Sequence, residues 1–183
     1  VVDGGISDVL NPWILDRWNF LAPNHRDEEH GTFIGGLMVA GGQLNGIDIC
    51  PETDGCHLID IDILPSEDVS TAEYFNSTTE FLDELASAVQ TLKAKTGVRI
   101  FNFSLNVEQA VESDSYHPFS RRLDQIAQEN DVIFIISAGN TEFHRPEWPD
   151  DPVQALTILA GTTNDQLKVP AESVRNLSVG AVN

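Results

Sequence analysis

The sequence predicts an α/β fold with a mostly parallel, doubly wound sheet and helices on both of its faces. Short apolar runs of strand length alternate with helix-like segments along the chain, and this order is typical of right-handed crossovers between parallel strands. Residues 132–136 (VIFII) are apolar at every position, as expected of a strand covered on both faces. The length of 183 residues suits one domain.

Five segments have the pattern of strands. In residues 57–64 and 98–105 apolar and polar side chains alternate, which is the period of a strand. The candidate core residues of the first of these segments are Leu58, Ile59, Ile61 and Ile63. The predicted strands lie near residues 1–3, 57–64, 98–105, 132–137 and 177–182.

Three segments are predicted to be helices, over residues 32–40, 75–95 and 120–130. The first is rich in glycine, so its helix would depend on tertiary packing. In the second, apolar residues recur at helical spacing until Gly97 ends it. The segments that remain are rich in Asn, Asp, Gly and Pro, which predicts irregular loops over residues 8–29, 42–56 and 141–151.

Composition excludes several classes of function. The net charge is −19, from 10 basic and 29 acidic residues, and such a surface repels the phosphate backbone of nucleic acids. No apolar run approaches the roughly 18 residues that a membrane span needs. No signal peptide is recognisable. The abrupt start at Val1-Val2-Asp3 leads us to expect a piece of a longer protein, and the sequence says nothing of its oligomeric state.

Cys50 and Cys56 leave three alternatives open. Two cysteines are too few for a disulfide framework, although a single disulfide closing this short loop is compatible with the sequence. His57 follows directly, but Cys-x5-Cys-His lacks the spacing and the fourth ligand of a usual zinc site. The simplest interpretation is that both cysteines are reduced thiols.

Three polar residues lie where functional groups gather in a parallel sheet, beyond strand ends or at a helix start. Asp3 follows the first predicted strand, His30 precedes a Gly-rich helix, and Asn140 ends Ser-Ala-Gly-Asn after a buried strand. Histidine suits a general base near neutral pH, and an asparagine amide can donate to a developing oxyanion. Each residue taken alone also has a simpler interpretation: Asp3 as the start of a turn, His30 as a structural or exposed histidine, and Asn140 as an asparagine tolerated at positive φ. We expect all three to converge on one side of the sheet.

The run Asn102-Phe103-Ser104-Leu105-Asn106 closes the third predicted strand. An exposed backbone edge at this place could pair with an extended peptide, although the simple alternative is a strand end. A nucleotide-binding domain is disfavoured, because neither Gly-x-Gly-x-x-Gly nor Gly-Lys-Ser/Thr follows a strand.

Together and in this order, the motifs resemble the subtilase family of serine peptidases (peptidase family S8). Asp3 lies in a strand-Asp-x-Gly block, and residues 30–36 are similar to the family's His-Gly-Thr-x-x-Ala-Gly block. Residues 102–106 resemble its Asn-x-Ser-Leu-Gly block, and residues 137–140 resemble its Ala-Ala-Gly-Asn block. Val169-Pro170-Ala171 and the segment 177–181 resemble the Tyr-Pro-Ala and Ser-Val-Gly-Ala segment that precedes the catalytic serine. The resemblance therefore runs from Val1 to Asn183.

This resemblance implies a subtilisin-like fold and hydrolysis of polypeptide substrates by an Asp-His-Ser triad, without a cofactor. Asp3 would orient His30, which takes the proton from the serine, and Asn140 would bind the oxyanion. The substrate would lie along Ser104, Leu105, Asn106, Ala138 and Gly139. Members of the family are mostly secreted, whereas two cysteines without a leader also fit the cytoplasm, so the compartment stays open.

The sequence departs from the family pattern in several places. Gly35 replaces the usual Ala, and Asn106 replaces a Gly, so its side chain is expected to narrow the substrate cleft. Residues 42–55 differ from the family's calcium loop, so no calcium site is carried over. The Gly-Thr-Ser-x-Ala-x-Pro block of the nucleophile is absent.

Because the serine block is missing, two hypotheses follow. In the first, residues 1–183 are part of the catalytic domain of a serine endopeptidase whose serine lies downstream, and this piece is inactive by itself. In the second, the chain is an inactive pseudopeptidase or a peptide-binding module of the same fold.

Overall fold

The computed structural model describes residues 1–46, 48, 54–107, 109–112, 114–140, 149–161 and 167–180. One sheet of six strands has the order β2-β3-β1-β4-β5-β6, and every neighbouring pair is parallel. The strands are β1 (Val2–Asp3), β2 (Ile14–Asn19), β3 (Leu58–Asp62), β4 (Ile100–Phe103), β5 (Ile133–Ser137) and β6 (Leu177–Val179). The predicted α/β fold with a parallel sheet is confirmed.

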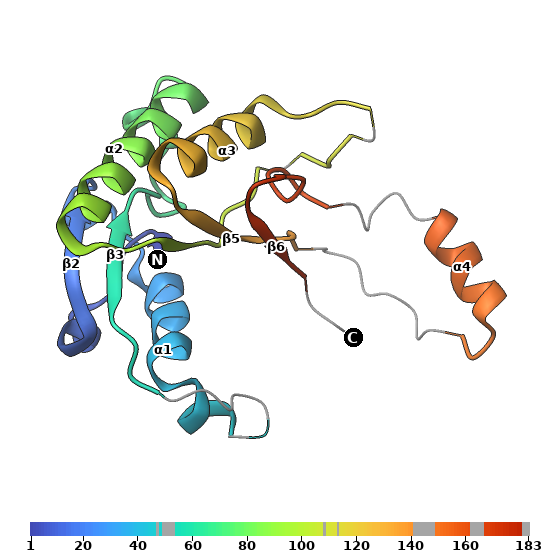
Figure 1. The fold of residues 1–183 in the computed structure, drawn as a ribbon, viewed down its shortest axis with the longest axis horizontal. Coiled ribbons are helices and arrows are strands. Elements are labelled where there is room, and N and C mark those ends of the chain that lie inside the picture. Colours follow the sequence, from blue (N-terminus) through green and yellow to red (C-terminus); the bar gives the residue numbers. More distant parts are fainter. Residues whose placement is uncertain are drawn as a thin grey trace.

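Helices cover both faces of the sheet, as predicted. Figure 1 shows α2 (Thr78–Thr96) and α3 (Pro118–Asn130) side by side on one face and α1 (Glu28–Asn45) on the other. The fourth helix, α4 (Pro152–Gly161), lies apart from the sheet in this view. Within the described ranges, no helix has the length and apolar character needed to cross a membrane.

Two apolar clusters hold these layers together. The larger one lies between the sheet and the pair α2 and α3, and the aromatic rings of Phe101, Phe103 and Phe134 form its centre, each almost fully buried. The smaller one joins α1 to the sheet and contains Val1, Ile6, Leu10, Val39 and Leu58. Neighbouring residues pack into different clusters at the start of β1 (Val1 and Val2) and of β3 (Leu58 and Ile59), which fixes the register of these strands.

The prediction that residues 8–29 form an irregular loop is wrong. The segment contains a 3₁₀ helix (Asp8–Trp13), the edge strand β2, a second 3₁₀ turn (Pro23–His25) and the start of α1. Strand β2 pairs with β3 through residues 14–19, and its Arg17 reaches inward to a buried carboxylate. The composition rich in Asn, Asp and Pro that suggested a loop thus conceals an edge strand, and an inward-pointing charge such as that of Arg17 is common in edge strands.

The predicted loop over residues 42–56 is wrong in its first part, because α1 continues to Asn45. Residues 47 and 49–53, Cys50 among them, lie outside the described residues. Cys56 is an exposed free thiol whose Sγ donates to the Met38 carbonyl at 3.0 Å. Most of the third predicted loop, residues 141–148, also lies outside the described part, and α4 follows it without having been predicted.

Candidate active site

Asp3 and His30 meet at the carboxyl end of β1. Asp3 is the last residue of this strand, and its side chain is only 5% exposed. One carboxylate oxygen, Oδ1, accepts the backbone N–H of Gly4 at 2.8 Å. The other, Oδ2, lies 2.7 Å from Nδ1 of His30, whose side chain is 53% exposed. The expected contact between the two residues is therefore present, with a buried carboxylate behind a ring that is open to solvent.

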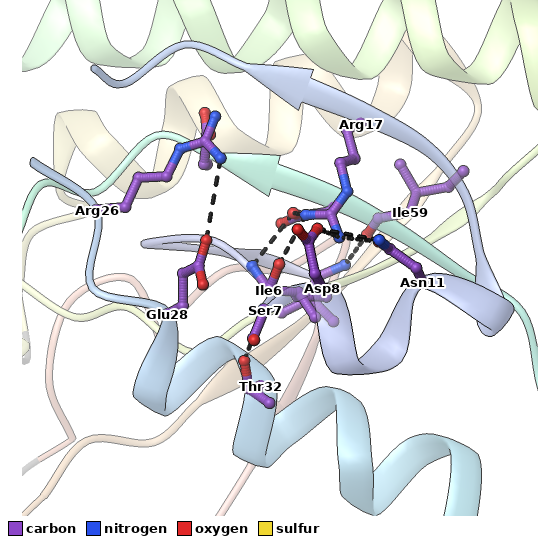
Figure 2. Close-up of polar contacts among 12 residues, drawn as sticks. Ile6, Ser7, Asp8, Asn11, Arg17, Arg26, Glu28, Thr32 and Ile59 are labelled. Atoms are coloured by element: carbon purple, nitrogen blue, oxygen red, sulfur yellow. Dashed lines mark hydrogen bonds and ion pairs between the residues drawn. The ribbon is translucent and has the colours of Figure 1, made fainter. Parts of the chain in front are cut away.

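The start of α1 determines where His30 lies. Asp27 caps the helix, since its side chain accepts the backbone N–H of Glu29, and two acidic residues in the first turn complement the positive end of the helix dipole. Thr32 Oγ1 accepts the backbone N–H of Ser7 at 2.8 Å, and Figure 2 shows this contact between the turn after β1 and the helix. These bonds tie the histidine-bearing turn to the aspartate-bearing strand.

Gly31 allows α1 to approach β1 closely enough for this contact. A Cβ atom at position 31 would lie 2.3 Å from the carbonyl oxygen of Gly5 and 3.2 Å from the Cβ of Asp3. The first distance is far below any real contact with backbone. The glycine that follows the histidine is therefore required by packing.

Two further carboxylates are buried in β3, the strand that pairs with β1. Asp60 and Asp62 are 1% and 0% exposed, although the alternation of residues 57–64 singled out only the apolar positions as core. Both faces of β3 are covered, so both sets of side chains are buried. Arg17 on β2 lies 2.5 Å from Asp60 and also donates to the Ile6 carbonyl, and Figure 2 shows it between Ile6 and Asn11.

Burial raises the pKa of Asp60 to about 6, although the N–H of Ile6 and the charge of Arg17 oppose the shift. Burial also raises the pKa of Asp62, against the N–H groups of Phe20 and Leu21 and the charge of Arg26, whose Nη2 lies 2.6 Å away. These pairs anchor residues 17–26, which lead to the histidine-bearing helix.

The predicted substrate-binding residues Ser104, Leu105 and Asn106 follow directly after β4. Ser104 Oγ donates to Asn102 Oδ1 at 2.9 Å, and Asn106 Nδ2 donates to the Ser137 carbonyl at 2.9 Å. Leu105 and Asn106 line a pocket of about 400 Å³. Its other walls are largely apolar and aromatic, and they include Leu64, Phe75, Phe81, Phe103 and Phe119. This pocket was not predicted, because its walls come from four separate parts of the sequence.

Ala138, Gly139 and Asn140 follow directly after β5. Ala138 donates its N–H to the Val179 carbonyl at 2.9 Å and accepts the N–H of Lys168 at 3.0 Å. Gly139 has φ +100°, a conformation that favours glycine, and Asn140 beyond it is exposed. β4 separates β1 from β5, and the segment that ends at Asn140 leaves the sheet at the carboxyl ends of the strands, as the chain does after Asp3.

Lys168 is the neighbour of this loop that sequence reasoning missed. Its Cγ would lie 2.4 Å from a Cβ built on Gly139, so its alkyl chain packs directly against the glycine. Only the likeness of residues 169–171 to a family segment pointed to this region. No group of three or more His, Cys, Asp or Glu side chains suited to a metal was found in the part of the chain that the structure describes.

Comparisons with known proteins agree with this arrangement. Residues 16–183 match the sequence model of the Subtilase family, Peptidase_S8. The fold resembles the prenylagaramide maturation protease PagA, with 19% identity and a TM-score of 0.51, and the MycP3 protease from the type VII (ESX-3) secretion system, with 20% identity and a TM-score of 0.54. Both matches cover 100% of this chain but only 51% and 52% of the other chains, so it spans about half their length. No curated protein matches the sequence.

Proposed function

Because the chain belongs to the subtilase family, we propose that it is part of a serine endopeptidase that hydrolyses peptide bonds with an Asp-His-Ser triad. Asp3 and His30 are its two triad members within residues 1–183. The serine is supplied by polypeptide that follows residue 183. The observation that carries this proposal is the 2.7 Å contact between the buried Asp3 carboxylate and His30 Nδ1.

This contact suits a general base. A carboxylate that accepts the Nδ1 proton holds the imidazole in the tautomer whose Nε2 is free to accept a proton, and it stabilises the imidazolium that then forms. Among the described residues, no hydroxyl group is hydrogen-bonded to Nε2 of His30. The exposed side of the ring is therefore available to a serine that attacks the substrate carbonyl.

Asn140 is proposed to bind the oxyanion of the tetrahedral intermediate. A donor amide that is fixed before the reaction stabilises the negative charge as it develops, which is worth about 10²–10³-fold in kcat. The bonds of Ala138 to residues 168 and 179 support this role, because they hold the backbone just before Asn140.

Residues 104–106 are proposed to bind the substrate as an extended strand on the acyl side of the scissile bond. Backbone groups at a strand edge give affinity, and side-chain pockets give specificity. The pocket of about 400 Å³ beside Leu105 has no lining residue from 137–140, so it is distinct from the space next to Asn140. It suits one large apolar side chain of a substrate residue other than the one that contributes the scissile carbonyl, since four phenylalanines contribute to its lining.

The proposal that further polypeptide completes the domain has a second support. Strands of a parallel sheet are normally covered on both faces. On the α1 side, however, Ile100, Leu177 and Val179 are 66%, 55% and 56% exposed. An apolar face of this kind suits coverage by the remaining half of the domain.

Kinetic analysis of triad variants in the full-length protein tests this function. With a fluorogenic peptide, we expect His30→Ala and Asp3→Asn each to lower kcat by about 10⁴-fold or more, because either change removes the oriented base. His57→Ala is the matched control, since His57 is exposed and precedes β3 at the opposite end of the sheet. A His30→Ala variant that keeps more than a tenth of the activity would contradict the proposal. Peptide binding without hydrolysis by the unaltered protein would favour the pseudopeptidase instead.

A further inference from the structure

Three backbone segments converge beyond the carboxyl ends of β4 and β5. The strands pair side by side, with Phe103 opposite Ile136, and the chain then continues as residues 104–107 and 137–140. The third segment, residues 167–169, is bonded to both: Lys168 donates to the Ala138 carbonyl at 3.0 Å, and Val107 donates to the Val169 carbonyl at 2.8 Å. The third segment therefore borders the space between the first two.

The side chain of Asn106 bridges the first two segments. Its Nδ2 donates to the Ser137 carbonyl at 2.9 Å, which links the segment after β4 to the segment after β5. The bond is partly buried. A substrate side chain entering between the two segments would have to displace it and leave the Ser137 carbonyl without this donor. Losing a partly buried hydrogen bond in this way disfavours large side chains.

Lys168 narrows the same space from the third segment. A Cβ on Gly139 would lie 2.4 Å from its Cγ and 2.7 Å from its Cβ, so the alkyl chain of Lys168 covers the face of Gly139. Gly139 is the residue directly before Asn140. The methylene groups of Lys168 thus occupy the space next to the residue that precedes the proposed oxyanion donor.

We propose that the site accepts only a small side chain, of Gly, Ala or Ser, at the acyl residue, meaning the substrate residue that contributes the scissile carbonyl. The inference rests on the proposed role of Asn140. When the oxyanion lies about 3 Å from the Asn140 amide, the scissile carbonyl carbon lies beside residues 138–140, and the Cα of the acyl residue is bonded to this carbon. The substrate backbone is proposed to run along residues 104–106. The side chain of the acyl residue then falls between residues 104–106 and 138–140, where the Asn106 bridge and Lys168 leave little room.

The selectivity is measured with two fluorogenic peptides that differ only in an acyl residue of Ala or Phe. For the full-length protein, kcat/KM for the Ala peptide is expected to exceed that for the Phe peptide by at least about tenfold, since a misfit in a pocket costs on the order of 10–200-fold. In Asn106→Gly the Ala-to-Phe ratio should fall at least about tenfold, because the bridge is gone. Asn106→Ala and Lys168→Ala serve as second variants and should lower the ratio in the same direction.

Asn45→Ala is the matched control, because its Nδ2 donates to the Gly41 carbonyl at the far end of α1, and the ratio should not change. A full-length protein that prefers the Phe peptide, or whose ratio is unaffected by every change at positions 106 and 168, overturns the inference alone. A protein that cleaves neither peptide and does not react with a fluorophosphonate overturns the proposed function and the inference with it.

Discussion

At the scale of single residues, the Asp3–His30 pair depends on Gly31, the glycine of α1 that lies against the turn after β1. The histidine motif of the sequence identified His30, and the strand-end position identified Asp3, so this pair could be predicted. The tightness of the contact could not, because the carbonyl oxygen of Gly5 that excludes a side chain at position 31 belongs to another part of the chain. The same helix contains Gly36, whose missing Cβ faces open space.

Replacing these two glycines by alanine should therefore have opposite effects on stability. Gly31→Ala is expected to lower the free energy of unfolding by about 1–3 kcal/mol, because α1 must move away from β1. Gly36→Ala should raise it by roughly 0.5–1 kcal/mol, because alanine restricts the unfolded chain and favours a helix. Urea unfolding of both variants gives the comparison, and a Gly31→Ala variant as stable as Gly36→Ala would contradict the close packing.

Contacts with distant parts of the chain were also not predictable for the substrate-binding residues. The sequence placed Asn106 beside the cleft, but the partner of its amide is the Ser137 carbonyl, 31 positions away. Lys168 carried no signal of its own. Both contacts follow from strand adjacency, which the sequence does not encode locally.

At the scale of elements, regular patterns were predicted correctly and irregular ones were not. The apolar spacing of residues 81–92 predicted α2, and the run at 132–136 predicted β5. Strand β2 was missed because polar residues interrupt it, although Ile14 and Trp18 have the β-branched and aromatic character of a strand. The start of α1 was placed too late because Asp27, its cap, was assigned to a loop.

One buried carboxylate links α3 to the segment that leads into β6. Asp124 accepts hydrogen bonds from the hydroxyl groups of Tyr116 and Ser173, from the N–H groups of Val174 and Arg175 at 3.1 Å, and from Asn176 Nδ2 at 3.0 Å. Burial raises the pKa of Asp124, but the hydrogen bonds outweigh burial, so the pKa lies below its ordinary value of 3.8. The ionised form therefore stabilises the folded protein.

The consequence is a stability difference that depends on pH. Asp124→Asn should lower the free energy of unfolding by about 1–3 kcal/mol near pH 7, because the amide cannot accept every one of these bonds. Since the folded pKa is depressed, the contribution of the carboxylate is present above pH 3.8 and is lost as the pH falls through the lower folded value. Urea unfolding at several pH values should show the difference shrinking below pH 4. Asp68→Asn, at an exposed position, is the control, and a difference that stays constant down to pH 3 would contradict the assignment.

At the scale of the whole molecule, the alternation of strands and helices was sufficient to predict the parallel α/β architecture. The order of the strands was not predictable in the same way, because β1 lies between β3 and β4 and the edge strand β2 was absent from the pattern. That order brings Asp3, the segment after β4 and the segment after β5 to one edge of the sheet. The candidate site is therefore a product of topology as much as of its motifs.

The central claim is that His30 activates a serine carried by polypeptide beyond residue 183, and a fluorophosphonate probe tests it most directly. Such probes react with activated serines, and peptide mass spectrometry identifies the labelled residue. In the full-length protein we predict stoichiometric labelling of one serine downstream of residue 183, abolished by His30→Ala and kept in His57→Ala, whereas residues 1–183 alone stay unlabelled. A labelled serine within residues 1–183, or full-length protein that stays unlabelled, would contradict the account.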